Sequence, residues 1–287
     1  MKLLFIGDIV GRPGRSALRQ ALPALVERFQ PGLVIANGEN AAAGFGITPS
    51  VAQEMLTAGV DVITTGNHVW NKKEAQQLLV QEARVLRPAN YPPEAPGRGA
   101  GIFPSRNGAP VAVINLCGRV FMDCIDCPFR EVERRIPELR DQARMVVVDM
   151  HAEATSEKLA MAWMVTGRVS AVIGTHTHVQ TADAQVMPGG TAYITDVGMV
   201  GPRDSVLGIE AGLVIERFRR RLPVKFELAR GPVTVGAVVV DIDEESGCAR
   251  SIEPLLETMP DPLGEATDEA TSPDEAGLRC PRRRGPS

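Results

Sequence analysis

Short apolar runs alternate with amphipathic stretches along the first 180 residues of the chain. The apolar runs predict strands at residues 2–7, 33–37, 61–66, 111–116, 145–150 and 171–175. Apolar residues at helical spacing predict helices over residues 16–29 and 155–165. Thr48 and Pro49 predict a further helix start before Asp61, because threonine caps helices and proline suits their first position. Runs that are apolar throughout are typical of strands covered on both faces, so the pattern predicts an α/β protein.

The pattern changes after residue 180. Residues 185–195, 223–228 and 232–243 are strand-like and joined by glycine and proline, with one short helix predicted over residues 213–219. We expect these strands to form a second, more antiparallel sheet packed on the first. Residues 259–287 are polar and proline-rich and show no apolar periodicity, which predicts a disordered tail after one domain of residues 1–258.

Composition narrows the class of protein. The chain is 44% hydrophobic and 23% charged, as in ordinary soluble proteins. Its net charge of -4 does not indicate the excess of positive charge that binds duplex DNA. The first apolar run ends after Ile6, too early for a signal peptide, and no run approaches the ~18 apolar residues of a membrane span. We therefore expect a cytoplasmic protein with no membrane partner. The sequence leaves the oligomeric state open, a homo-oligomer included.

Five cysteines form an odd set that argues against a disulfide scaffold. Cys124 and Cys127 make a C-x-x-C pair, but the sequence shows neither a thioredoxin-like context nor a second pair of zinc ligands. We interpret them as two loop cysteines.

Polar side chains follow five of the six predicted strands, at the point where each strand ends. All four histidines are among them, beside carboxylates and carboxamides. Ligands of open α/β sheets gather at the carboxyl ends of strands, so this clustering favours one site over several independent structural roles. The candidates are Asp8, Glu39, Asn40, Asn67, His68, His151, His176 and His178.

These residue types favour a transition metal. Histidine nitrogens with carboxylate and carboxamide oxygens, and no cysteine, suit Fe or Mn, with Zn as an alternative. Apart from His68, the candidates are too many for one ion with an open position. They suit two ions that share a bridging carboxylate, an arrangement used to activate water and hold a phosphoryl group.

The motifs have a recognisable order. GD, a later acidic residue, GNH, an isolated histidine and G-x-H-x-H resemble the calcineurin-like metallophosphoesterases. Within that superfamily, GDIVGRPGR, NGENAAAGFGIT, TGNHVW and TDVGMVGPRDSVLGIE are similar to the YmdB-like family of bacterial phosphodiesterases. The resemblance runs to about residue 240. It implies a four-layer α/β/β/α sandwich with a dinuclear metal site.

The resemblance also implies a role for each candidate ligand: Asp8, Asn40 and His178 at the first ion, Asn67, His151 and His176 at the second, and Glu39 bridging both. Two positions depart from the wider superfamily. The usual D-x-H motif reads Asp8-Ile9-Val10, and glutamate stands where a bridging aspartate is usual. We infer that Glu39 bridges and that Asn40 replaces the missing histidine.

The function implied is hydrolysis of a phosphodiester, most simply a 2′,3′-cyclic nucleotide such as 2′,3′-cyclic AMP. His68 is the candidate general acid, because it adjoins a ligand without being assigned as one. No substrate-binding residue is assigned. Arg12 and Arg15 fit either phosphate contact or solvent exposure, and Phe45 fits either stacking on a base or packing. A phosphomonoesterase or phosphoprotein phosphatase, and a metal-containing regulatory protein of RNA metabolism without turnover, remain alternatives.

Overall fold

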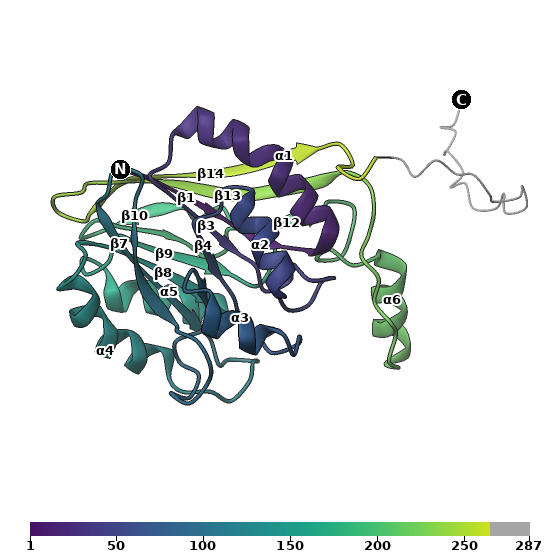
Figure 1. Ribbon diagram of the computed structural model, residues 1–287. Helices are drawn as coiled ribbons and strands as arrows, with labels where there is room; N and C mark the ends of the chain where they lie inside the picture. The colour runs from purple at the N-terminus through teal and green to yellow at the C-terminus, as the bar shows by residue number, and fades with distance from the viewer. Residues whose placement is uncertain (265–287) are drawn as a thin grey trace, which may run out of the picture.

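A computed structural model describes residues 1–264 of the chain (Figure 1). Two β-sheets lie face to face, and helices cover the outer face of each. Three buried apolar clusters fill the spaces between these layers. The fold is therefore the four-layer α/β/β/α sandwich that the family resemblance implies.

The first sheet has eight strands in the order β2-β12-β13-β1-β3-β4-β5, with β14 paired to β13. Strands β1, β3, β4 and β5 are parallel, whereas β13 pairs with β1 in antiparallel register, Leu4 opposite Val239. The bounds are β1 (Lys2–Ile6), β2 (Asp8–Ile9), β3 (Leu33–Asn37), β4 (Val62–Thr64), β5 (Val85–Leu86), β12 (Met199–Pro202), β13 (Val233–Ile242) and β14 (Ala249–Met259).

The second sheet has six strands in the order β10-β11-β9-β8-β7-β6. Its central strands β7, β8, β9 and β11 are parallel, and antiparallel strands close both edges. The bounds are β6 (Ala100–Pro104), β7 (Pro110–Cys117), β8 (Met145–His151), β9 (Ala171–Thr175), β10 (Gln185–Met187) and β11 (Thr191–Ile194).

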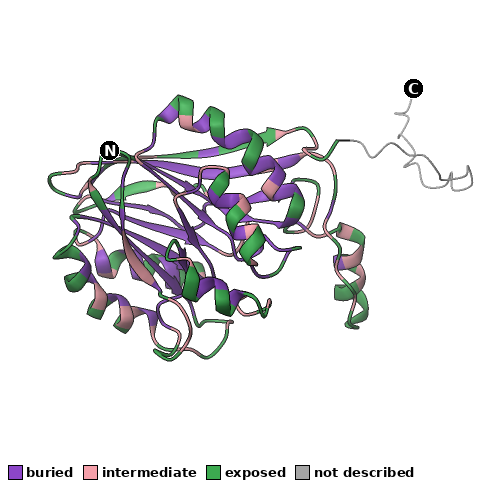
Figure 2. Cartoon of the chain, viewed as in Figure 1, coloured by how far each residue is buried: buried purple, intermediate pink, exposed green. Residues whose placement is uncertain are grey.

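Helices α1 (Gly11–Phe29), α2 (Pro49–Thr57) and α3 (Ala75–Gln81) cover the first sheet, and α4 (Pro128–Arg140) and α5 (Thr155–Val165) cover the second. The Thr48 hydroxyl accepts a hydrogen bond from Val51 N at 3.4 Å, which confirms the predicted cap of α2. Figure 2 shows that the central strands of both sheets are buried, whereas β14 and helix α6 (Ala211–Arg220) are mostly exposed. Helix α6 stands away from the sandwich. None of the helices in residues 1–264 is long and apolar enough to cross a membrane.

Several expectations about these elements are wrong. The second sheet is built from the middle of the chain, because residues 111–116, 145–150 and 171–175 pair with one another. The late strand β13 instead joins β1 in the first sheet. Residues 223–228 form no strand and make only one bridge, Leu228 to Ile209. Helix α1 begins at Gly11, before the predicted Ser16.

The predicted domain boundary at residue 258 stays a prediction, but β14 continues one residue past it. Met259 is the last residue of β14 and pairs with Val233. Residues 265–287, most of the predicted tail, lie outside the described residues. The disordered character of that tail therefore stays a prediction.

A buried ion pair fixes one corner of the second sheet. Lys158 on α5 donates to Asp196 Oδ2 at 2.8 Å, and neither side chain is exposed to solvent. The same carboxylate accepts hydrogen bonds from Thr177 N and Oγ1 at 3.0 and 2.7 Å. Asp196 therefore ties α5 to the turn that contains the H-x-H motif.

We expect Lys158→Met to lower the free energy of unfolding by about 3–5 kcal/mol, because it leaves the Asp196 charge buried without its partner. Arg134→Met is the matched control: the Arg134–Glu131 pair spans 2.7 Å, but the arginine side chain is 54% exposed. Its loss should cost at most about 1 kcal/mol. Urea unfolding followed by circular dichroism measures both. Equal losses in the two variants would contradict the structural role of the buried pair.

Candidate metal centre

The predicted site residues converge where the carboxyl ends of the two sheets meet. The first sheet supplies Asp8 in β2, the pair Glu39-Asn40 after β3 and the pair Asn67-His68 after β4. The second sheet supplies the remaining histidines: His151 ends β8, and His176 and His178 follow β9. The candidates therefore face one another from opposite layers, whereas the sequence indicated only that they share the ends of strands.

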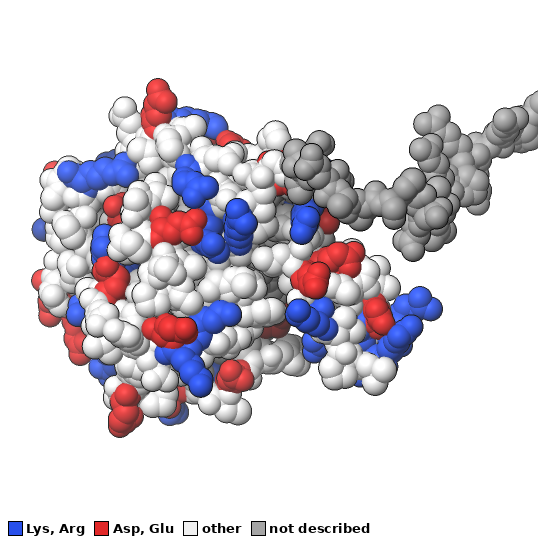
Figure 3. Space-filling model, turned by 45° about the vertical axis from the view of Figure 1, so that its right-hand side comes forward, with Lys and Arg blue, Asp and Glu red and all other residues white. Residues whose placement is uncertain are grey.

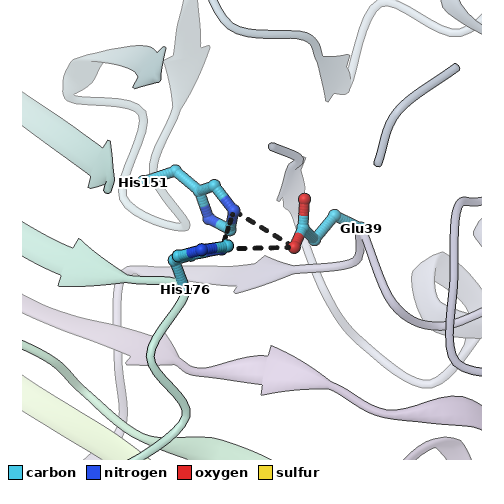
Figure 4. Close-up of side chains that lie close together, drawn as sticks. All are labelled: Glu39, His151 and His176. Atoms are coloured by element: carbon cyan, nitrogen blue, oxygen red, sulfur yellow. Dashed lines mark hydrogen bonds and ion pairs between the residues drawn. The ribbon is translucent and has the colours of Figure 1, made fainter. Parts of the chain in front are cut away.

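Glu39, His151 and His176 form the tightest group (Figure 4). His151 Nε2 lies 3.1 Å from Glu39 Oε1 and 3.0 Å from His176 Nδ1. Asn67 Oδ1 lies 3.2 Å from the same His151 nitrogen. These four residues include the three predicted ligands of the second ion and the predicted bridge.

A second group lies on the other side of Glu39. His178 Nε2 is 3.1 Å from Asn40 Nδ2 and 3.8 Å from Asp8 Oδ1. Asn40 Nδ2 also donates to Glu39 Oε1 at 3.1 Å. Glu39 thus lies between the two groups of predicted ligands, in the position that a bridging carboxylate requires.

The outer nitrogen of each histidine is occupied by a protein acceptor, which fixes the ring and leaves the inner nitrogen for a metal. His151 Nδ1 lies 2.9 Å from Thr175 Oγ1, whose hydroxyl donates to Asp149 Oδ1 at 2.7 Å. His176 Nε2 lies 3.2 Å from Glu153 Oε2. His178 Nδ1 lies 3.1 Å from the carbonyl oxygen of Leu207. None of these acceptors is predicted from the sequence.

The charges of the cluster favour a bound cation. Burial raises the pKa of Asp8 well above its ordinary value. Burial also opposes the charge of Glu39, but His151 and His68 more than offset this and hold the pKa of Glu39 well below its ordinary range. Burial lowers the pKa of His151, yet the charge of Glu39 prevails and raises it to about 9. Glu39 thus stabilises a positive charge beside it, whereas burial and the charge of His151 lower the pKa of His176 to about 3.

Two further observations show that the residues fit a metal ion. Asp8 Oδ1 is buried and has no hydrogen-bond partner in the structure, as expected for an oxygen whose partner is a cation. Gly66 lies against the cluster, and a Cβ there would collide with His151 Nε2 and Glu39 Oε2. The chain thus keeps space free beside the inner atoms of these ligands.

The H-x-H turn has an unusual backbone. His176 and His178 have φ angles of 97° and 63°, in the left-handed region that non-glycine residues seldom adopt. The intervening Thr177 is held by the buried carboxylate of Asp196, and His176 N donates to Asp8 Oδ2 at 3.1 Å. This strain is tolerated because neighbouring groups fix the turn, and it aims both rings at the cluster.

His68 lies beside the ligand groups and is partly open to solvent, with its side chain 28% exposed. Its Nδ1 lies 2.9 Å from Asn40 Oδ1, and its backbone N–H donates to Glu39 Oε2 at 3.2 Å. The Phe45 ring meets the imidazole edge to face at 5.0 Å. His68 therefore sits at the boundary between the cluster and an open cavity of about 460 Å³.

Comparison with known proteins places the chain in a family. The model of the YmdB-like protein family matches residues 4–255. The chain belongs to the YmdB-like family. A 2′,3′-cyclic-nucleotide 2′-phosphodiesterase of Bacillus subtilis is 47% identical to it over 89% of this chain and 97% of the relative.

Two solved structures share the YmdB-like fold of this chain. A hypothetical protein of Thermus thermophilus is 43% identical, with a TM-score of 0.85 over 91% of this chain and all of its own. A protein of Mycoplasma pneumoniae described as a novel phosphatase is 31% identical, with a TM-score of 0.85 over 92% and 95% of the two chains. These likenesses confirm the family and the fold that the motifs predict.

We expect Glu39→Gln to lose most of its bound metal, because the variant keeps the shape of the side chain but removes the charge between the two ligand groups. Elemental analysis after incubation with Mn²⁺ and gel filtration measures metal per chain. Glu27→Gln, on an exposed position of α1, is the control and should retain the wild-type content. Wild-type metal content in the Glu39 variant would rule out the bridging role.

Proposed function

We propose that this chain is a metal-dependent phosphodiesterase that hydrolyses 2′,3′-cyclic nucleotides such as 2′,3′-cyclic AMP. The observation that supports this most is Glu39, buried between two groups of metal-binding side chains, with His68 beside it at the mouth of a cavity. The name of the Bacillus subtilis relative supports the substrate class. It also supports cleavage at the 2′ oxygen, which leaves a nucleoside 3′-phosphate.

Two metal ions, Fe or Mn by preference, complete the proposed centre. Asp8, Asn40 and His178 would hold one ion, Asn67, His151 and His176 would hold the other, and Glu39 would contact both. When bound, such ions lower the pKa of water and stabilise negative charge on phosphoryl oxygens. The protein supplies the fixed geometry: the buried carboxylates, and three rings whose outer nitrogens are already engaged.

The departing ribose oxygen needs a proton as its bond to phosphorus breaks, and His68 supplies it in this proposal. Its Nδ1 is engaged by Asn40 Oδ1, so the proton to be donated is on Nε2. His68 lines the cavity together with four of the predicted ligands, which supports a role for it on the substrate side of the centre. The edge-to-face contact with Phe45 holds the ring in that orientation.

We expect His68→Ala to retain its metal and to lose about 10²- to 10⁴-fold in kcat on 2′,3′-cyclic AMP, the range for a general acid. The loss should be much smaller on bis-p-nitrophenyl phosphate, because p-nitrophenolate departs without a proton. Steady-state kinetics and elemental analysis of the same preparations test this. A variant that loses metal, or loses both activities equally, would contradict the assignment of His68 as the acid.

The substrate class is tested by comparing three esters with metal-loaded protein. We expect turnover of 2′,3′-cyclic AMP to adenosine 3′-phosphate, identified by chromatography against the 2′ isomer, and far weaker hydrolysis of p-nitrophenyl phosphate. Preference for the monoester, or for a phosphoserine peptide, would instead indicate a phosphatase. Two bound metals with no turnover of any ester would indicate a binding role.

A further inference from the structure

The cavity beside the metal centre has two chemically different faces. One face consists of polar side chains of the centre, among them Glu39, His68 and His178. The apolar lining, here called the apolar face, consists of Phe45, which lies beside His68, and of Leu207, Ile209, Val214, Phe218 and Phe226. A phosphoryl group bound by metals needs only the polar face. The apolar face therefore indicates a surface of the protein that binds the rest of the substrate.

Most of the apolar face belongs to one segment, residues 203–230, here named the α6 arm. Both ends of the arm are joined at its base: Arg203 N donates to Pro232 O at 2.8 Å, and Ala229 N donates to Gly208 O at 3.0 Å. Leu228 packs against Gly11 and Gly44, where a Cβ on either glycine would press on its side chain. The base of the arm is thus fixed against the body of the domain.

The arm also touches the metal centre. The Leu207 carbonyl oxygen lies 3.1 Å from Nδ1 of His178, a predicted ligand. Gly208 packs on Val10, where a side chain would collide, and Val10 directly precedes α1. The distance between the apolar wall and the predicted ligands is therefore set by direct contacts.

Helix α6 forms a wall and does not pack as a core helix. Val214 is its only buried residue, and Phe218 remains 68% exposed. The helix supports its own N-terminus, because the Glu210 carboxylate accepts hydrogen bonds from Gly212 N and Leu213 N at 2.9 Å. An amphipathic helix normally buries its apolar side against the domain, but here the cavity lies in between.

We propose that this cavity is a nucleobase subsite, in which the base of the substrate stacks between Phe45 and the α6 arm. This inference rests on the proposed function. Flat surfaces for stacking are present on both sides: the Phe45 ring beside His68, and the Arg217 guanidinium over the Phe226 ring at 5.0 Å. Aromatic rings and guanidinium groups are the side chains on which nucleobases stack.

The position of Phe45 orders the parts of the substrate. Phe45 touches His68, the proposed proton donor to the ribose oxygen, and lies between Gly44 and Gly46 in the loop that follows Asn40. A base stacked on Phe45 therefore places its ribose next to His68 and its cyclic phosphate next to the predicted ligands. The cavity has room for one nucleoside, at about 460 Å³.

The α6 arm carries charges of both signs, with seven Lys or Arg and four Asp or Glu residues in residues 203–230. Figure 3 shows both Lys or Arg and Asp or Glu side chains on the surface of the arm, which stands out beside the body. A surface for a long nucleic acid would be positive along its whole length. The acidic residues among the basic ones and the aromatic residues of the cavity fit one base better than a strand.

The test compares two substrates that differ only in the base: 2′,3′-cyclic AMP and methyl riboside 2′,3′-cyclic phosphate. We expect the wild type to show a KM at least about 10-fold lower for the nucleotide, the range for loss of a stacked base. Phe226→Ala and Arg217→Ala should raise KM for the nucleotide by about 5- to 10-fold and leave KM for the abasic ester unchanged. Metal content and kcat on the abasic ester should stay at the wild-type value.

Ile215→Ala is the matched control, because Ile215 is 53% exposed on the same helix and does not line the cavity. It should change neither KM. Phe226→Leu keeps the volume of the side chain but removes the flat ring, so it serves where the alanine variant folds poorly. An equal KM for the two substrates in the wild type, or equal effects of Phe226→Leu on both, would overturn the subsite.

Calorimetric titration with adenosine 3′-phosphate and with ribose 3-phosphate separates failure of the subsite from failure of the function. The base subsite is supported if adenosine 3′-phosphate binds more tightly than ribose 3-phosphate and Phe226→Leu removes this difference in affinity. This result supports the subsite even when no cyclic ester is hydrolysed. Turnover of both cyclic esters with equal binding of both phosphates retains the phosphodiesterase and overturns the subsite.

Discussion

The site depends on one buried carboxylate. Glu39 is fully buried where two sheets meet, a position at which an ionised group is stable only beside compensating charge and hydrogen-bond donors. His151, from the opposite sheet, supplies that charge at 3.1 Å, and Asn40 and the His68 backbone supply donors. Bringing Glu39 into the interior thus requires the two layers to close with their carboxyl edges together. The geometry of the centre and the packing of the sandwich satisfy the same constraint.

Much of the local structure could be predicted because local patterns determine it. The apolar runs that became β1, β3, β8 and β9 needed only their own residues, since strands covered on both faces are continuously apolar. The division of strands between the sheets could not be predicted. Pairing of β13 with β1 joins residues more than 230 positions apart, and the residues of neither strand indicate which strand it pairs with. Residues 223–228 alternate like a strand, but only Phe226 among them lines the cavity, and their one bridge, Leu228 to Ile209, is not extended into a ladder.

The residues of the candidate centre could be predicted from the sequence, but the contacts that orient them could not. Asp8, Asn40 and His176 were found because each follows an apolar run, and the end of a strand is a place that sequence can identify. Glu153 and Thr175 stand close to ligands in the sequence, yet their contacts with ring nitrogens depend on the turn that His176 adopts. Lys158 was hidden within an ordinary helical pattern. The sequence could therefore indicate which side chains come together at the site, but not which hydrogen-bond partners orient them.

The contact between Leu207 and His178 connects two parts of the molecule with different tasks. The predicted ligands are held at strand ends deep in the sandwich, whereas the apolar wall belongs to an arm whose helix has one buried residue. Changes along α6 can alter the wall without disturbing the packing that holds Glu39. Changes at the base of the arm would disturb the candidate centre as well, because the Leu207 carbonyl orients His178, a predicted ligand. Substrate preference in this architecture is therefore free to vary at the tip of the arm and constrained at its base.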